Sequence, residues 1–278
     1  MKGYGEAGGA LSVVNAIACG FGAAFGISLS TKATAELSED DEFSLSINGR
    51  ESSTVLVKEL FRELVPLLPE ECRGVHVETV SDIPPSVGLK SSSAASNAIL
   101  LAMIHAADVT ISPIDLIRMG CRASIKAGVS ITGAFDDACS SLFGGLVLTD
   151  NTRMEILQER PMPENYEAVI CIPEDSQRQF SADRFRMHAD EMQRIFQTAE
   201  SGDIFSAMYE NGRIVGSVSG IGTEIADAAI RAGAVTAGIS GAGPAVGILV
   251  QKDNLDSIFS AFSEWNCLHC SIRNKGVI

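Results

Sequence analysis

Hydrophobic and polar positions along the chain follow two spacings. Short runs rich in Val, Ile, Ala and Phe between turn residues predict strands, and longer segments with apolar residues three and four apart predict helices. The predicted strands span residues 9–17, 23–35, 43–47, 74–80, 142–149, 167–172, 235–239, 245–250 and 267–272. The predicted helices span residues 53–67, 92–107, 113–127, 183–199, 203–211, 222–231 and 255–262. This mixture predicts an α+β fold.

The apolar stretch at residues 10–29 has two explanations. With Lys2 before it, its length is compatible with a signal peptide or a membrane anchor. However, glycines interrupt it repeatedly, and Glu6 and Asn15 add polar groups. We therefore predict two buried strands joined by a turn at residues 19–22, in a cytoplasmic protein that does not enter a membrane.

Composition narrows the class of protein. The 278 residues are 46% hydrophobic and 20% charged, enough for a sizeable core in one large domain or two modest ones. A formal net charge of -14 disfavours a nucleic-acid partner, because phosphates are repelled. The polar, proline-bearing stretch at residues 152–165 predicts a boundary between domains at 1–155 and 156–278.

The seven cysteines are irregularly spaced and mostly lie in apolar surroundings. We expect reduced thiols, as in a cytosolic protein. Cys267 and Cys270 have the spacing of half a zinc site or of a redox pair, but a second such pair to complete a zinc site is missing. Two small residues in a terminal strand are the favoured interpretation.

Residues 82–96 read Asp-Ile-Pro-Pro-Ser-Val-Gly-Leu-Lys-Ser-Ser-Ser-Ala-Ala-Ser. Two prolines and a glycine predict a rigid loop, and a helix begins directly after it. The free N–H groups and the dipole of such a helix start attract phosphate, and Lys90 adds a full positive charge. The alternative is an ordinary turn followed by a serine N-cap, although one serine would suffice for a cap.

Two further segments are candidates for chemistry. Residues 132–137 (Thr-Gly-Ala-Phe-Asp-Asp) place adjacent carboxylates in an otherwise uncharged stretch, which is uncommon without a partner. We expect only one of Asp136 and Asp137 to face a site; the alternative is an N-cap for a helix starting at Asp137. Residues 240–244 (Ser-Gly-Ala-Gly-Pro) lie between two strands and allow close approach of a ligand, or form a tight hairpin turn.

Other phosphate-binding motifs do not fit. A Walker A loop requires a second glycine where this chain has Leu89. The His-Arg-Asp and Asp-Phe-Gly motifs of protein kinases are missing, and so is a Rossmann fingerprint after a convincing first strand.

Together the three segments resemble the GHMP kinase superfamily, whose second motif, Pro-x-x-x-Gly-Leu-Gly/x-Ser-Ser-x-Ala, is matched by residues 84–95. Within it, the chain is similar to the archaeal-type shikimate kinases. The similarity rests on the opening Gly-Tyr-Gly-Glu-Ala-Gly-Gly-Ala from Gly3, the triple serine, residues 132–138 and residues 240–245.

The resemblance implies a two-domain α+β fold with a ribosomal-protein-like N-terminal domain, a ferredoxin-like C-terminal domain and a site between them. It implies transfer of the γ-phosphoryl group of ATP to the 3-hydroxyl of shikimate, with Mg²⁺. It makes Asp136 the base and Lys90 a second catalytic group, and Ser92 the Mg²⁺ ligand. The implied nucleotide-binding residues are Pro85, Gly88, Leu89, Lys90, Ser91, Ser92, Ser93, Ala94, Gly241 and Gly243.

Some features of the family pattern have no clear counterpart. The mevalonate kinase lysine that assists the aspartate could be matched only by Lys2, and Arg122 and Lys126 lie where a second Mg²⁺ ligand would be. For Lys90, contact with a phosphate and simple exposure to solvent both stay open.

The acceptor is the weaker inference from the sequence. A shikimate carboxylate calls for a basic partner, for which Arg178, Arg184 and Arg186 are candidates. Another superfamily kinase, such as a homoserine kinase, and a non-catalytic nucleotide-binding protein are the alternatives.

Overall fold

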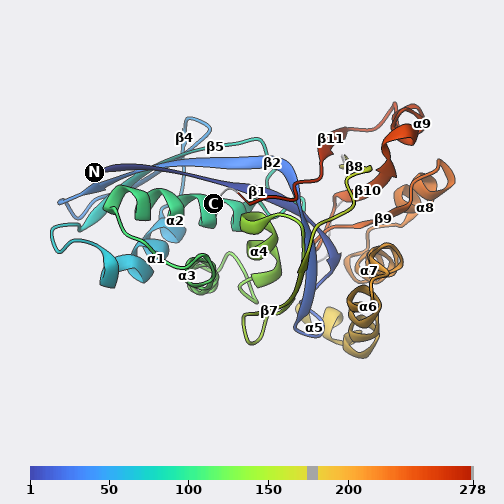
Figure 1. The fold of residues 1–278 in the computed structure, drawn as a ribbon, viewed down its shortest axis with the longest axis horizontal. Helices are drawn as coiled ribbons and strands as arrows, with labels where there is room; N and C mark the ends of the chain where they lie inside the picture. The colour runs from blue at the N-terminus through green and yellow to red at the C-terminus, as the bar shows by residue number, and fades with distance from the viewer. Residues whose placement is uncertain (174–180, 277–278) are drawn as a thin grey trace.

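The computed structural model describes residues 1–173 and 181–276. Over these residues the strands form two sheets, one of seven strands and one of four. Figure 1 shows helices α1–α4 against one face of the larger sheet, and the C-terminal helices α6–α8 at the opposite end of the molecule. The mixed α+β architecture is thus confirmed. Within the described residues, no helix has the length and apolar character needed to cross a membrane.

The larger sheet has the order β4-β3-β5-β2-β6-β7, and β1 pairs with β2. Only β3 and β5 run parallel; the other pairs are antiparallel. Its strands are β1 (Lys2–Val14), β2 (Phe21–Ser38), β3 (Phe43–Ile47), β4 (Arg50–Glu51), β5 (Gly74–Ser81), β6 (Leu146–Asp150) and β7 (Glu155–Arg160). The apolar N-terminal stretch therefore forms two strands, as predicted.

The helices of this half pack beneath the sheet. They are α1 (Val55–Leu64), followed by a 3₁₀ turn (Val65–Leu67), α2 (Ser91–Ala107), α3 (Pro113–Lys126) and α4 (Phe135–Phe143). As predicted, α2 is central and almost wholly buried. A side chain at Gly3 or Gly5 of β1 would collide with backbone atoms of α2. The alternating glycines of the opening sequence thus let a strand lie directly on this helix.

The second half is built on an antiparallel sheet of order β11-β8-β10-β9. Its strands are β8 (Tyr166–Cys171), β9 (Thr236–Ile239), β10 (Val246–Gln251) and β11 (Cys267–Ser271). Its helices are α5 (Ala182–Arg186), α6 (Ala189–Ser201), α7 (Ile204–Ser219), α8 (Glu224–Arg231), a 3₁₀ turn (Lys252–Asn254) and α9 (Leu255–Ala261).

The two halves share a hydrophobic core. Leu11 of β1 and Phe25 and Ile27 of β2 belong to the same buried cluster as the C-terminal helices. In return, Ile272 bridges to Ile27, and Arg273 reaches the backbone of the first half. The two halves are therefore packed together rather than loosely tethered.

Several predicted elements differ from the structure. The strand predicted at residues 9–17 starts at Lys2 and ends at Val14, and the helix predicted at residues 203–211 continues to Ser219. The single helix at residues 183–199 is divided into α5 and α6. The strand expected at residues 142–149 starts only at Leu146, because α4 continues to Phe143 and two glycines of positive φ follow it. The polar stretch at residues 152–165 contains β7, in which exposed and half-buried residues alternate. Such a pattern is suited to a strand at the edge of a sheet. The proposed division at residue 155 falls where β7 starts.

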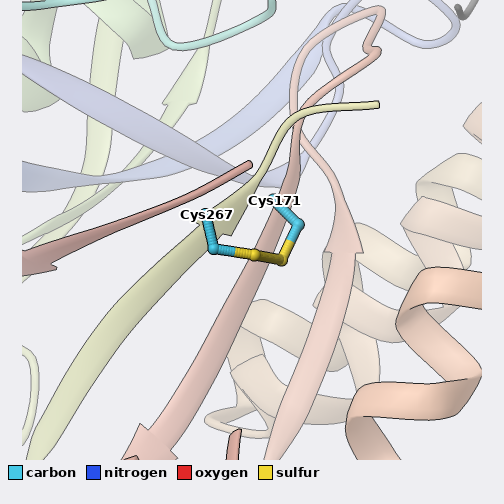
Figure 2. Close-up of a disulfide and its surroundings, with 2 residues drawn as sticks. All are labelled: Cys171 and Cys267. Atoms are coloured by element: carbon cyan, nitrogen blue, oxygen red, sulfur yellow. A yellow bond between two sulfur atoms is a disulfide. The ribbon is translucent and has the colours of Figure 1, made fainter. Parts of the chain in front are cut away.

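The expectation of reduced thiols is wrong for one pair. Cys171 and Cys267 form a disulfide across β8 and β11 (Figure 2), while five other cysteines are free. The two lie 96 residues apart in sequence, but the sheet register places them directly opposite each other. Cys267 therefore pairs with Cys171 and not with Cys270, and the prediction that Cys267 and Cys270 lie in a terminal strand is confirmed.

Candidate active site

A cavity of about 400 Å³ lies between the two halves of the molecule. Its lining comes from four segments of the chain: residues 15–17 after β1, residues 86–93 before and at the start of α2, residues 124–137 around the α3–α4 connection, and residues 241–242 between β9 and β10. All three candidate segments predicted from the sequence thus meet in one place.

The start of α2 forms one wall of the cavity. No side chain caps this helix, and its first internal hydrogen bond runs from the Ala94 N–H to the Lys90 carbonyl at 3.0 Å. The backbone N–H groups of Ser91, Ser92 and Ser93 precede that bond, and all three serines line the cavity. An uncapped helix start with hydroxyls beside it is a fitting cradle for phosphate oxygens, so the simple N-cap alternative is wrong.

The loop before α2 is held by the glycine-rich loop of the other half. The Ser240 Oγ donates to the Gly88 carbonyl at 2.8 Å, and the Ala245 N–H donates to the Val87 carbonyl at 3.0 Å. Gly88 has a φ of +95°, and any side chain there would collide with the Ser240 carbonyl. The glycine is therefore required both for its backbone conformation and for the close contact.

Lys90 connects the three segments. Its side chain is only 7% exposed, and its Nζ lies 2.9 Å from the Asp137 Oδ1 and 2.8 Å from the Ser12 Oγ. The Ser12 Oγ also accepts from the Gly241 N–H at 3.0 Å. The alternative that Lys90 faces solvent is wrong, because the ammonium group is directed into the cavity wall.

Asp136 lies in the first turn of α4 and is 3% exposed. Its Oδ1 accepts from the Asn151 Nδ2 at 2.7 Å, and its Oδ2 lies against Gly22 of β2, where a side chain would collide with it. Burial, followed by the nearby Asp137 carboxylate, raises the pKa of Asp136 to about 7, against the opposing effects of Lys90 and Asn151. A carboxyl group that titrates near neutrality is suited to accept a proton.

The expectation that only one of the two aspartates faces the site is wrong. Both Asp136 and Asp137 line the cavity. Since α4 starts at Phe135, the two side chains leave the first turn of a helix rather than opposite faces of a strand. The alternative of a helix starting at Asp137 is wrong for the same reason. The two carboxylates have separate partners, Asn151 and Lys90.

Several predicted residues lie outside the cavity lining. Pro85 is exposed, Leu89 and Ala94 are buried in the hydrophobic core, and Gly243 packs against Ile221. These positions shape the loops that carry the lining residues. The predicted residues that do line the cavity are Gly88, Lys90, Ser91, Ser92, Ser93, Asp136 and Gly241.

The arginines proposed for an acceptor carboxylate are not brought to the cavity. Arg184 donates to the Ser217 carbonyl at 3.2 Å, and Arg186 pairs with Asp183 at 2.7 Å. Arg178 lies outside the described residues. Among the described residues of the lining, Lys90 is the one Lys or Arg.

Lys2 does not take the place of the lysine in the mevalonate kinase pattern. It lies at the exposed start of β1, and the next residue, Gly3, contacts Ala102 and Ala106 near the end of α2. At a rise of 1.5 Å per residue, this part of α2 lies roughly 20 Å from the start of the helix, where Lys90 and the three serines lie. Lys90 supplies the positive charge beside the aspartates instead.

The sequence interpretation missed four polar residues that organise the site. Ser12 and Asn15 extend from the end of β1, and the Asn15 Nδ2 donates to the Gly241 carbonyl at 2.8 Å. Thr149 and Asn151 stand at the end of β6, behind Asp136. A buried polar residue at a strand end is a weak signal, since nothing in the local sequence says which segment it will meet.

The oxygen atoms of the lining are suited to magnesium. The Ser92 hydroxyl is a hard oxygen ligand of the kind that Mg²⁺ accepts. Over the described residues there is no group of three or more His, Cys, Asp or Glu side chains that could hold a metal by themselves. This set fits an ion held largely by phosphate oxygens and water, as is usual for Mg²⁺ beside a nucleotide.

Two models of known protein domains match this chain. Residues 54–145 match the model of the GHMP kinases N terminal domain, and residues 206–266 match the GHMP kinases C terminal model. The chain belongs to the GHMP kinases.

Curated relatives extend over nearly the whole chain. A shikimate kinase of Methanosarcina mazei is 36% identical, covering 100% of this chain and 97% of the relative. A shikimate kinase of Methanothrix thermoacetophila is 38% identical, covering 95% of this chain and 90% of the relative.

A solved structure described as MDDEF in complex with MVAPP, AMPPCP and magnesium has the same fold. Its TM-score is 0.76 at 16% identity, and the match covers 99% of this chain and 98% of that chain. At this identity the likeness concerns the fold alone.

Proposed function

We propose that this chain is a kinase that transfers the γ-phosphoryl group of ATP to the 3-hydroxyl of shikimate. The observation that carries the proposal is the cavity itself, where the uncapped start of α2 and Lys90 stand beside the buried carboxyl group of Asp136. Similarity to curated shikimate kinases over the full chain supports the choice of acceptor.

The residues of the phosphate loop hold the nucleotide. The N–H groups of Ser91, Ser92 and Ser93 donate to phosphate oxygens, and the dipole of α2 adds partial positive charge. The Lys90 ammonium carries three N–H donors; one is donated to Ser12, and the ammonium also forms an ion pair with Asp137. A further N–H is directed to a phosphate oxygen. The Ser92 hydroxyl would be a protein ligand of Mg²⁺, which would withdraw negative charge from the phosphates.

Asp136 accepts the proton. As the acceptor oxygen bonds to the γ-phosphorus and the bond to the β–γ bridging oxygen breaks, ADP departs and the hydroxyl proton passes to the carboxylate. General-base assistance of this type is typically worth about 10²–10⁴-fold. A pKa of about 7 leaves a large fraction of Asp136 ionised at neutral pH and keeps it basic enough to take the proton.

The acceptor is tested by coupled ADP release with ATP, Mg²⁺ and a panel of shikimate, homoserine and mevalonate. We expect shikimate to give the highest kcat/KM by more than about 10³-fold, because a site built to bind one set of hydroxyls rejects molecules lacking them.

Two outcomes of the same assay contradict the proposal. A higher kcat/KM with homoserine or mevalonate assigns the chain to another branch of the family. Measurable ATP binding without ADP release stimulated by any of the three acceptors favours a non-catalytic nucleotide-binding protein.

A further inference from the structure

Asn151 holds Asp136 at two points. The residue follows β6, and its backbone N–H donates to the Gly20 carbonyl at 2.8 Å, which anchors it beside the turn between β1 and β2. Its Nδ2 donates to the Asp136 Oδ1 at 2.7 Å, and its Oδ1 accepts from the Asp136 backbone N–H at 3.2 Å. The amide group of Asn151 is therefore hydrogen-bonded to both the side chain and the backbone of Asp136.

The donors around the amide determine which end is oxygen. The backbone N–H of Asp136 can only donate, so the amide atom facing it must be the oxygen. The Thr149 Oγ1, 2.6 Å from the same atom, donates a second hydrogen bond. The NH₂ end is thereby turned to the carboxylate, and the chain Thr149–Asn151–Asp136 has a single direction.

This arrangement makes the two oxygens of Asp136 unequal. Oδ1 is engaged by the amide, whereas Oδ2 lies against Gly22, a position without a side chain to cover it. The contact with Asn151 also fixes the rotation of the carboxyl group, which is 3% exposed. One oxygen is thus held by Asn151, whereas the other is not held by this amide, in a residue that lines the cavity.

We propose that Asn151, oriented by Thr149, is a positioning residue that anchors the Oδ1 of Asp136 and presents its Oδ2 to the acceptor hydroxyl. The proposal rests on the function proposed above, in which Asp136 is the base. It adds two buried residues, Thr149 (0% exposed) and Asn151 (4% exposed), to the machinery of phosphoryl transfer.

The contact also affects the protonation of Asp136. A hydrogen bond donated to a carboxylate favours the charged form, so Asn151 lowers the pKa that burial and Asp137 raise. The other ionisable groups that act on Asp136 or respond to it are Lys90 before α2, Cys121 on α3 and Cys139 on α4. All three stay in place when Asn151 is replaced, so a shift in titration reports the loss of this one donor.

Asn151→Ala is the first test. We expect kcat to fall about 10²-fold, the scale of a misplaced reacting group, while the KM values for ATP and acceptor change less than about threefold. The acidic limb of the kcat profile should move up by about one pH unit, since a hydrogen bond to a charged group is lost. In the ligand-free protein, the carboxyl ¹³C signal that disappears in Asp136→Asn should titrate at a correspondingly higher pH.

Thr149→Val is the second test, because it keeps the shape of the side chain and removes the hydroxyl that orients Asn151 at 2.6 Å and also lies 3.4 Å from the Gly22 carbonyl. Its effects on kcat and on the titration of Asp136 should have the same direction as those of Asn151→Ala and be smaller. Thr149→Ser, which keeps the hydroxyl, is the rescue variant and should recover most of the loss.

The outcomes separate the two proposals. Near-wild-type turnover of Asp136→Asn contradicts the role of Asp136 as base. A slow Asp136→Asn variant together with wild-type kcat and titration in Asn151→Ala contradicts the role of Asn151 alone. A lower kcat in Asn151→Ala with unchanged titration and a lowered thermal midpoint also overturns it, since that result describes a structural residue only.

Discussion

The two walls of the cavity are made in different ways. The wall at the start of α2 comes from consecutive residues and works through backbone N–H groups, serine hydroxyls and one lysine. The other wall carries Asp136 of α4 beside Asp137, and Asp136 is held from behind by Gly22 of β2 and Asn151 after β6. Its proposed chemistry depends on the buried carboxyl group of Asp136. The first binds charge with many equivalent donors, whereas the second depends on the position of one oxygen.

This difference predicts unequal sensitivity to substitution. Loss of one donor from the serine wall leaves the helix dipole and the remaining N–H groups in place. Loss of the Asp136 carboxylate removes the proposed proton acceptor altogether. Substitution of Asn151 behind it alters both the position and the pKa of that carboxylate. Three measurements test this contrast.

Asp136→Asn should have the largest effect. The amide keeps the size of the side chain but cannot take a proton, so kcat should fall by about 10²–10⁴-fold while ATP binding is retained. Steady-state ADP release and equilibrium nucleotide binding measure the two quantities separately. Asp115→Asn, on the exposed face of α3, is the matched control and should turn over normally; equal rates for both variants would refute the contrast.

The same variant should change the pH dependence of stability. Burial raises the pKa of Asp136 from its ordinary value of 3.8 to about 7 in the folded protein, so the folded protein binds this proton more tightly than the unfolded chain. Wild-type stability is therefore lost progressively as the pH rises from about 4 through 7. Asn does not titrate, so Asp136→Asn should gain up to roughly 4 kcal/mol relative to wild type between pH 4 and pH 8.

Urea unfolding of both proteins at the two pH values measures this gain. A difference between variant and wild type that is the same at pH 4 and pH 8 would show that Asp136 titrates in the folded protein as it does in the unfolded chain. The electrostatic description of the buried wall would then be wrong.

Lys90→Met should have a smaller effect on the reaction than Asp136→Asn. It removes one positive charge from the serine wall, and a charge-assisted hydrogen bond corresponds to about 10–100-fold in kcat/KM for ATP. Lys126→Met, an exposed lysine on α3 paired with Glu63, is the matched control. A loss larger than that of Asp136→Asn would reverse the order of the two walls.

Much of the site could be predicted from local patterns. The proline, glycine and serine residues before α2 are consecutive, and loop geometry and helix-start chemistry are properties of consecutive residues. The alternating glycines of β1 could also be read from the sequence. That they are needed for direct contact with α2 could not. By contrast, the sequence pattern did not predict the break between α5 and α6, and it placed the start of β6 too early. Tertiary packing decides where a helix ends.

The amino-acid sequence by itself determined the class of fold, the loop and helix start at residues 84–96 and the aspartate pair, since each is specified by patterns of neighbouring residues. Only the tertiary structure decided that Asp136 meets Asn151, that Lys90 pairs with Asp137, and that Cys171 bonds to Cys267 across 96 residues. The physical reason is common to all three. A buried polar group or thiol takes its chemistry from whichever partner the sheet register and helix packing bring to it, and that partner lies far away in the chain.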